Sequence, residues 1–154
     1  MFQKTFLLIT FLILSSCGYE AIHSKKNLTV YDFSISELNL IGDREINLKI
    51  KEKLNNYTLG KKNKNFVLQV SSDTKKIILA KDTAGDPTSF KTTITISVEV
   101  LMKDNIKNNL LIVESFNYSN NTNKFDLKTY EKEIINNLAE TATDKLVFKL
   151  SNIQ

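Results

Sequence analysis

Cys17 is the only cysteine in the chain, and the residues before it give its thiol a specific chemistry. It follows Ser15 and Ser16 and comes after the run 6–14, in which eight of nine residues are apolar. A cysteine sulfur is a nucleophile that can accept a lipid group, and small residues before it fit a peptidase cleft. The apolar run is shorter than the ~20 residues that a bilayer-spanning helix needs. With Lys4 ahead of it, the run therefore predicts a cleavable secretory signal.

The segment 14–17 resembles a bacterial lipobox. In such signals the cysteine is lipidated on sulfur, the chain is cut before it, and the new amine is acylated. The resemblance implies a lipoprotein signal peptide over residues 1–16 and a lipidated tether over residues 17–27, held in the membrane by several acyl chains. Gly18, rather than Asp, implies sorting to the outer membrane. The alternative is an ordinary signal peptide in which Cys17 is only a small residue near the cleavage site.

Four lysines surround the strongest turn signal of the chain, the polar segment 82–87. They are Lys75, Lys76, Lys81 and Lys91. Ammonium groups at the tip of a hairpin can bind phosphate or carboxylate groups, so the sequence predicts an anion contact here, with lipopolysaccharide (LPS) or a barrel partner. The alternative is a solvated surface, since the chain has 21 Lys and Arg against 17 Asp and Glu. A nucleic-acid partner is not expected for an exported protein.

The other reactive residue types are too few for common catalytic sites. His23 is the only histidine and lies in the predicted tether among polar neighbours. A Ser–His–Asp or Cys–His site would have to use it, and a histidine-rich metal site cannot be formed. The sequence also lacks a Gly-rich phosphate loop and a second cysteine. It therefore favours a protein that is not an enzyme, with no catalytic residues, metal or cofactor.

The first part of the folded region predicts a strand followed by a helix. Residues 28–35 are rich in β-branched and aromatic side chains, which is typical of a strand. Ile46 and Ile50 recur at helical spacing after Asp43, a suitable N-cap, so a helix is expected from there to Gly60. The apolar residues at 46, 48 and 50 also alternate, so a strand is the alternative for this segment.

Three more strands are expected in the middle of the chain. Residues 66–80 predict a long strand, either straight or bent, and residues 110–118 predict the last one. Between them, residues 90–102 show the clearest alternation of apolar and polar side chains in the chain, which predicts a strand with one wet face. The side chains expected to face the core are Phe90, Thr92, Ile94, Ile96, Val98, Val100 and Met102.

A long amphipathic helix completes the pattern. Apolar residues recur at three- and four-residue steps from Leu127 to Leu146, and Asp126 is the expected N-cap. The expected fold is α+β, a two-layer α/β sandwich in the order β-α-β-β-β-α, with two helices on one face of a four-stranded, mostly antiparallel sheet. We expect residues 28–154 to form this single domain.

This arrangement resembles the LptE family of LPS-assembly lipoproteins. The start at residues 17–19, Cys-Gly-Tyr, is similar to the mature start of that family. The stretch 82–118 resembles the family's central hairpin, and 125–150 resembles its C-terminal helix. Family members often have a proline soon after the Cys-Gly-aromatic start, whereas the only proline of this chain is Pro87. The resemblance covers nearly the whole chain as an order of elements.

The resemblance implies a role without catalysis. It implies a lipid-anchored, periplasm-facing protein of the outer membrane of a diderm bacterium, which assists assembly of an LptD-type β-barrel, plugs it and helps insert LPS into the outer leaflet. The expected partners are that barrel, the membrane through the lipid anchor, and LPS itself as a further candidate. The alternatives are a periplasmic adaptor or inhibitor lipoprotein with another protein partner, and a lipoprotein hydrolase.

Overall fold

The computed structural model describes residues 31–60, 62–102 and 107–153. From Tyr31 on, these residues belong to one compact unit. They form strands and helices in the expected order β-α-β-β-β-α. The elements are β1 Phe33–Gly42, α2 Arg44–Leu54, β2 Lys64–Lys81, β3 Pro87–Leu101, β4 Lys107–Ser119 and α3 Lys124–Ser151, with a 3₁₀ turn, Asn55–Tyr57, after α2.

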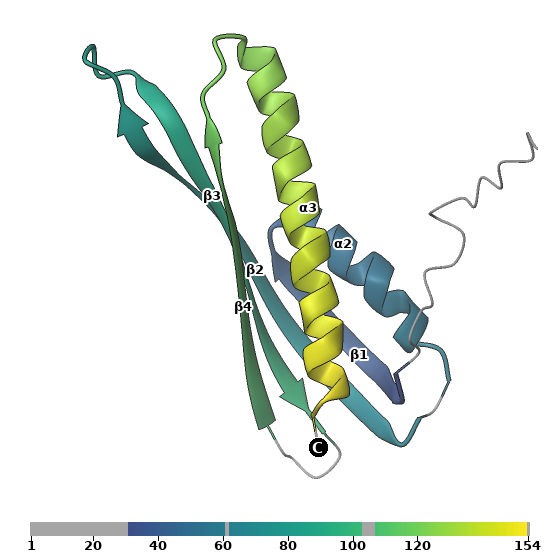
Figure 1. Cartoon of the computed structure of the whole chain (residues 1–154). Coiled ribbons are helices and arrows are strands. Elements are labelled where there is room, and N and C mark those ends of the chain that lie inside the picture. The colour runs from purple at the N-terminus through teal and green to yellow at the C-terminus, as the bar shows by residue number, and fades with distance from the viewer. Residues whose placement is uncertain (1–30, 61, 103–106, 154) are drawn as a thin grey trace, which may run out of the picture. The chain divides into compact units, whose positions relative to one another are not determined.

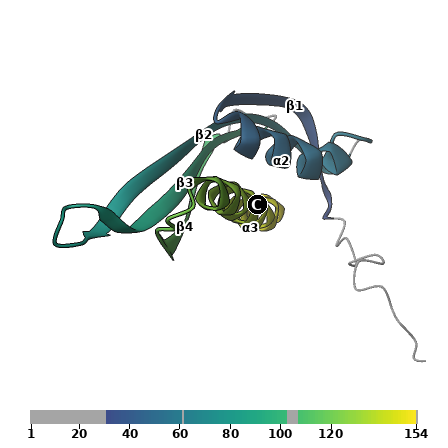
Figure 2. The same cartoon turned by 90° about the horizontal axis from the view of Figure 1, so that it is seen from above.

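The strands form one sheet in the order β1-β2-β3-β4. β1 is parallel to β2, whereas β2 with β3 and β3 with β4 are antiparallel. Both helices pack on the same face of the sheet and leave the other face uncovered by secondary structure (Figures 1 and 2). The predicted α+β sandwich is therefore confirmed, with a mixed sheet that contains one parallel pair.

The alternation of β3 places one set of its side chains between the sheet and the helices. Ile94, Ile96 and Val100 are fully buried, and Met102 packs against the same core. The side chains on the opposite face, at the odd positions 91–99, are half-buried or exposed. The predicted inner face is thus confirmed. The helices contribute Ile46, Ile50, Leu54, Ala139, Ala142, Leu146 and Leu150 to this core.

β1 is longer than the sequence predicted. The strand expected over 28–35, whose first three residues lie outside the described ranges, begins at Phe33 and continues to Gly42. A β-bulge between Ile35 and Glu37 resets the alternation. The two later leucines of the strand therefore still pack against the core.

The segment after β1 is a helix, as its length and charges predicted, and the strand alternative is wrong. Asp43 is the N-cap, because its side chain accepts hydrogen bonds from the amides of Glu45 at 2.9 Å and Ile46 at 3.4 Å. The α-helical part ends at Leu54, before the expected stop at Gly60, and the 3₁₀ turn follows.

α3 begins three residues earlier than its apolar pattern indicated. Asn123, not Asp126, is the N-cap, and its side chain accepts hydrogen bonds from the amides of Phe125 at 3.0 Å and Asp126 at 3.5 Å. Asp126 lies in the first turn, where a carboxylate interacts favourably with the positive end of the helix dipole.

The β2–β3 hairpin is the longest feature of the sheet. β2 has 18 residues, which corresponds to about 59 Å at ~3.3 Å per residue. The distal part of the hairpin diverges from α3 and projects away from it (Figures 1 and 2). The two strands expected over 66–80 and 90–102, with a turn between them, are therefore confirmed.

Candidate binding surfaces of the sheet

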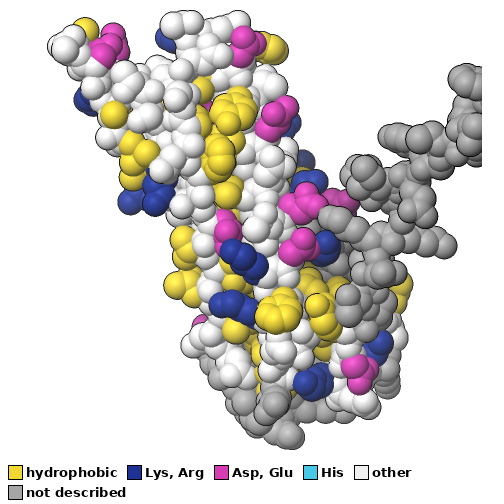
Figure 3. Space-filling model, viewed as in Figure 1, with side chains coloured by type: hydrophobic (Ala, Val, Ile, Leu, Met, Phe, Trp, Pro, Cys, Tyr) yellow, Lys and Arg dark blue, Asp and Glu magenta, His cyan; other side chains and the backbone are white. Residues whose placement is uncertain are grey.

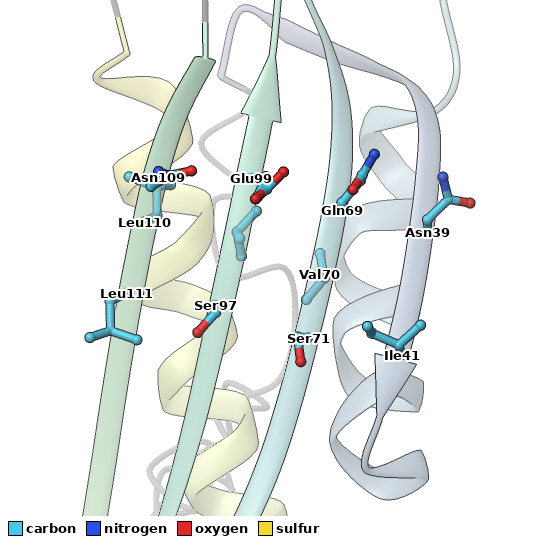
Figure 4. A pocket seen from close by; sticks show the side chains of 11 residues that line it. Asn39, Ile41, Gln69, Val70, Ser71, Ser97, Glu99, Asn109, Leu110 and Leu111 are labelled. Carbon is cyan, nitrogen blue, oxygen red and sulfur yellow. The ribbon is translucent and has the colours of Figure 1, made fainter.

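The uncovered face of the sheet carries side chains from all four strands in two transverse rows (Figure 4). One row consists of Asn39, Gln69, Glu99 and Asn109. The next row consists of Ile41, Ser71, Ser97 and Leu111. Neighbours across such a row have Cβ atoms ~5 Å apart. The first row is therefore a continuous line of amide and carboxylate groups, and the second has two hydroxyls between two aliphatic side chains.

These rows line an open groove of about 670 Å³. Ser71 and Ser97 form its floor, because their side chains are shorter than those around them. Ile41 and Leu111, 67% and 59% exposed, lie at the β1 and β4 ends of the groove. Glu99 is the only lining residue with a charge. The groove therefore suits a mostly neutral polar partner that also packs on the aliphatic margins. The sequence did not reveal these rows, because they depend on the register of four strands.

The four lysines predicted as an anion contact do not share one surface. Adjacent residues of a strand point to opposite faces, so Lys75 lies on the uncovered face and Lys76 on the helix face. Lys91 lies opposite Ile77 and is a diagonal neighbour of Lys75 on the uncovered face. Lys81 is exposed beside the turn. The structure therefore brings Lys75 and Lys91 together and separates Lys76 from them.

Lys76 belongs to a cluster that joins the hairpin to β4 and α3. Its ammonium forms an ion pair with Glu131 of α3 and lies 3.9 Å from the centroid of the Phe90 ring. Tyr118 of β4 donates a hydrogen bond of 2.9 Å to the same carboxylate, and its hydroxyl lies 3.2 Å from Thr92 Oγ1. Lys76 is thus engaged within the protein, and the cluster holds the base of the projecting hairpin against the body.

The tyrosine of the cluster is protonated near neutral pH. Burial raises the pKa of Tyr118 above its ordinary value of 10.0, and the hydrogen bond that the hydroxyl donates to Glu131 acts in the same direction. The hydroxyl therefore remains a donor near neutral pH, and this attachment of the hairpin does not depend on a protonation change of Tyr118 there.

Replacing Lys76 by Gln is expected to lower the free energy of unfolding by about 1 kcal/mol, because an ion pair and a cation–π contact are lost together. Lys75→Gln, one residue away on the uncovered face, should change it by less than about 0.5 kcal/mol. Urea unfolding followed by far-UV circular dichroism measures both. Equal losses for the two variants would contradict the assignment of Lys76 to a structural cluster.

Three consecutive aliphatic residues of the distal hairpin are exposed. Ile77, Ile78 and Leu79 are 42%, 47% and 46% exposed. The register shift between Ile78 and Ala80 places Leu79 in an irregularity, so the apolar run on the edge strand β2 reaches both faces of the sheet. The sequence missed this surface, because a short apolar run in a strand usually indicates burial.

The turn beyond these residues is closed by its own hydrogen bonds. The Asp82 side chain accepts from the amides of Ala84 and Asp86, each at 2.9 Å. Two backbone hydrogen bonds also close the turn. The Asp82 amide donates to the Asp86 carbonyl at 2.9 Å, and the Gly85 amide donates to the Asp82 carbonyl at 3.1 Å. Turn chemistry therefore accounts for Asp82, as its sequence context predicted.

A smaller hollow of about 270 Å³ lies between β4 and α3. Its apolar lining comes from Phe116 and three residues of α3, Tyr130, Ile134 and Leu138. Figure 3 shows apolar side chains gathered along this seam. Towards the C-terminal end of α3, Lys145 forms an ion pair with Glu114 of β4 and helps to close the seam.

Cys17 and His23 lie outside the described residues. Within the described ranges, no group of three or more His, Cys, Asp and Glu side chains could hold a metal ion. No helix in the same ranges is long and apolar enough to cross a membrane.

No protein-family model and no curated protein matches the chain. Among solved structures, rare lipoprotein B from Shewanella oneidensis is similar with a TM-score of 0.61 and 14% identity, over 77% of this chain and 93% of that one. A minor lipoprotein from Acinetobacter baumannii has a TM-score of 0.60 and 14% identity, over 79% and 92%. Lipoprotein B from Nitrosomonas europaea has a TM-score of 0.56 and 10% identity, over 79% and 83%. The chain therefore has the fold of these bacterial lipoproteins.

Proposed function

We propose that this protein is an outer-membrane lipoprotein that assists assembly of an LptD-type β-barrel, plugs it, and takes part in inserting LPS into the outer leaflet. The observation that carries this proposal is the fold, which the chain shares with rare lipoprotein B over 77% of its length. Proteins of the rare lipoprotein B type form the LptE family, which the sequence also resembles. The lipobox at residues 14–17 gives independent support.

The uncovered face of the sheet has the chemistry that a plug requires. The lumen of a large membrane β-barrel is lined with polar side chains. The amide and hydroxyl groups of the two rows can form hydrogen bonds with such a wall without a specific opposite charge. Ile41 and Leu111 can pack on aliphatic groups at the margins. We therefore assign this face as the surface that contacts the lumen.

The exposed lysines of the hairpin suit an anionic group. Lys75 and Lys91 lie on the same face as the groove, and Lys81 is exposed beside the turn. In this proposal they meet the phosphates of LPS or acidic groups of the barrel, and such contacts weaken as salt rises. Lys76 contributes only by holding the hairpin in place.

Affinity purification of the tagged full chain from membranes tests the proposal. A large outer-membrane β-barrel should co-purify with the wild-type protein, and depletion of the protein should reduce barrel assembly and surface LPS. Ser97→Arg, which fills the floor of the groove, should lower the amount of captured barrel. Ser115→Arg is the matched control. Ser115, on the neighbouring strand β4, is exposed like Ser97 but does not line the groove. Capture of a soluble periplasmic protein in place of a barrel would favour an adaptor or inhibitor.

Cys17→Ala should abolish labelling of the protein by a palmitate analogue. The variant lacks the sulfur that accepts the diacylglyceryl group, so lipoprotein processing should stop and the precursor should accumulate. Metabolic labelling followed by gel electrophoresis measures both effects. Normal labelling and normal cleavage of the variant would contradict a lipidated Cys17.

A further inference from the structure

We propose that the distal β2–β3 hairpin is a membrane-insertion element that docks on phospholipid bilayers with anionic headgroups. Its aliphatic residues Ile77, Ile78 and Leu79 enter the acyl region, and Lys75, Lys81 and Lys91 lie at the level of the phosphates. This inference gives the three lysines a phospholipid surface in place of the LPS or barrel contact of the proposed function, and it needs no barrel partner.

The apolar part of the argument is the exposure of the aliphatic run. The surfaces of soluble proteins carry scattered apolar residues. Three consecutive ones at 42–47% exposure on the projecting hairpin form a contiguous patch, which is typical of an interaction site. The hairpin is held at its base by Lys76, Glu131 and Tyr118 and is closed at its tip by the Asp82 hydrogen bonds. The patch is thus presented on an ordered support.

The charged part of the argument is the position of the lysines. Lys91 lies directly across from Ile77, and Lys75 is two residues before it on the same face. Lys81 lies two residues after Leu79 along the chain. Lysines around an aliphatic patch match the interface of an anionic bilayer, where acyl chains lie below phosphate groups. Asp86 at the turn would oppose insertion tip-first, so the hairpin meets the bilayer side-on.

The shape of the hairpin favours a bilayer over a single bound amphiphile. Sites for small ligands are concave and enclose most of the ligand. The groove and the seam hollow described above lie on the body of the sheet and along α3, and neither is lined by Ile77, Ile78 or Leu79. The aliphatic run lies instead on β2, an edge strand there, with apolar groups on both faces, which can enter an acyl layer but cannot enclose an acyl chain.

A single tryptophan tests this proposal cleanly, because the chain has none. Leu79→Trp reports on the patch, and Leu48→Trp is the matched control, since Leu48 is 56% exposed but lies on α2. The full lipidated chain is reconstituted into phosphatidylglycerol vesicles in which every vesicle contains brominated lipid. Quenching of the Trp emission by brominated lipid then detects contact of the hairpin with the vesicle that anchors the protein or with a neighbouring vesicle. Circular dichroism confirms that both variants fold.

The expected result is a blue-shifted emission and at least threefold stronger quenching for Trp at position 79 than at position 48. Combining Leu79→Trp with Lys75→Gln, Lys81→Gln and Lys91→Gln should reduce that quenching, and so should vesicles of pure phosphatidylcholine. Equal quenching at positions 79 and 48 would overturn the proposal. So would an emission shift at position 79 that requires added LPS, since the hairpin would then bind a single amphiphile. Barrel capture is measured separately, so its success or failure does not bear on this test.

Discussion

Ile96→Asp is expected to lower the free energy of unfolding by at least ~4 kcal/mol, which is a large part of the ~5–15 kcal/mol of a typical domain. Ile96 is fully buried on the helix face of β3, the second of the three sheet strands that pair in antiparallel fashion. A carboxylate there would lie among aliphatic side chains and would lose its hydration without gaining a partner. The protein should therefore unfold or lose cooperative unfolding at room temperature.

The control for this substitution lies on the uncovered face of the same strand. Thr93→Asp should cost less than about 1 kcal/mol, because the new carboxylate remains hydrated and lies opposite Lys75. Thr95→Asp is a poorer control, since Thr95 lies opposite Asp73 and would add repulsion. Far-UV circular dichroism with urea unfolding distinguishes the variants. Comparable losses for Ile96→Asp and Thr93→Asp would mean that the two faces of β3 are not as different as described.

Gly42→Ala is expected to have the second-largest effect, a loss of about 3 kcal/mol or more. Gly42 has a φ of +97°, which favours glycine, and a Cβ there would lie 1.9 Å from the carbonyl oxygen of Ser72. That oxygen also accepts the hydrogen bond of the Asp43 amide at 3.1 Å, so it cannot move without opening the junction between β1 and α2. The substitution should therefore disturb the N-terminus of α2 as well as the end of β1.

Gly85→Ala separates backbone strain from the clash. Gly85 has a similar φ of +91°, but a Cβ there meets no atom within 4 Å. Its replacement should cost only the left-handed strain of an alanine, roughly 1 kcal/mol. The difference between the urea midpoints of Gly42→Ala and Gly85→Ala measures the cost of the steric clash with the Ser72 carbonyl. If both variants lose the same stability, backbone conformation alone determines the role of Gly42.

The order of elements could be predicted because two segments had unambiguous periods. Aliphatic and polar side chains alternate from Ile94 to Val100, and the apolar residues from Leu127 to Leu146 keep helical spacing. The first residue of each helix was harder to predict, because several residues near each helix start are suitable N-caps. Asn123 and Asp126 both qualify, and the structure uses Asn123.

The candidate surfaces were less predictable than the fold. Strand alternation alone separates Lys75 from Lys76, so the sequence contained that information, but grouping lysines by their distance along the chain concealed it. The rows of the groove require the register of all four strands, which no local pattern gives. The exposure of Ile78, on the helix face, depends on where α3 lies over the sheet, and this is decided by tertiary packing.

The parallel pairing of β1 with β2 has a consequence for the order in which the chain folds. β2 pairs with β3 and β3 with β4 across short connections, so these loops close at a small entropic cost. Phe33 pairs with Lys64, and the whole of α2 lies between them. Because non-local pairing is slow, β1 is expected to join a preformed β2–β3–β4 meander. A chain that emerges into a new compartment N-terminus first would thus present its first strand unpaired until the later ones have arrived.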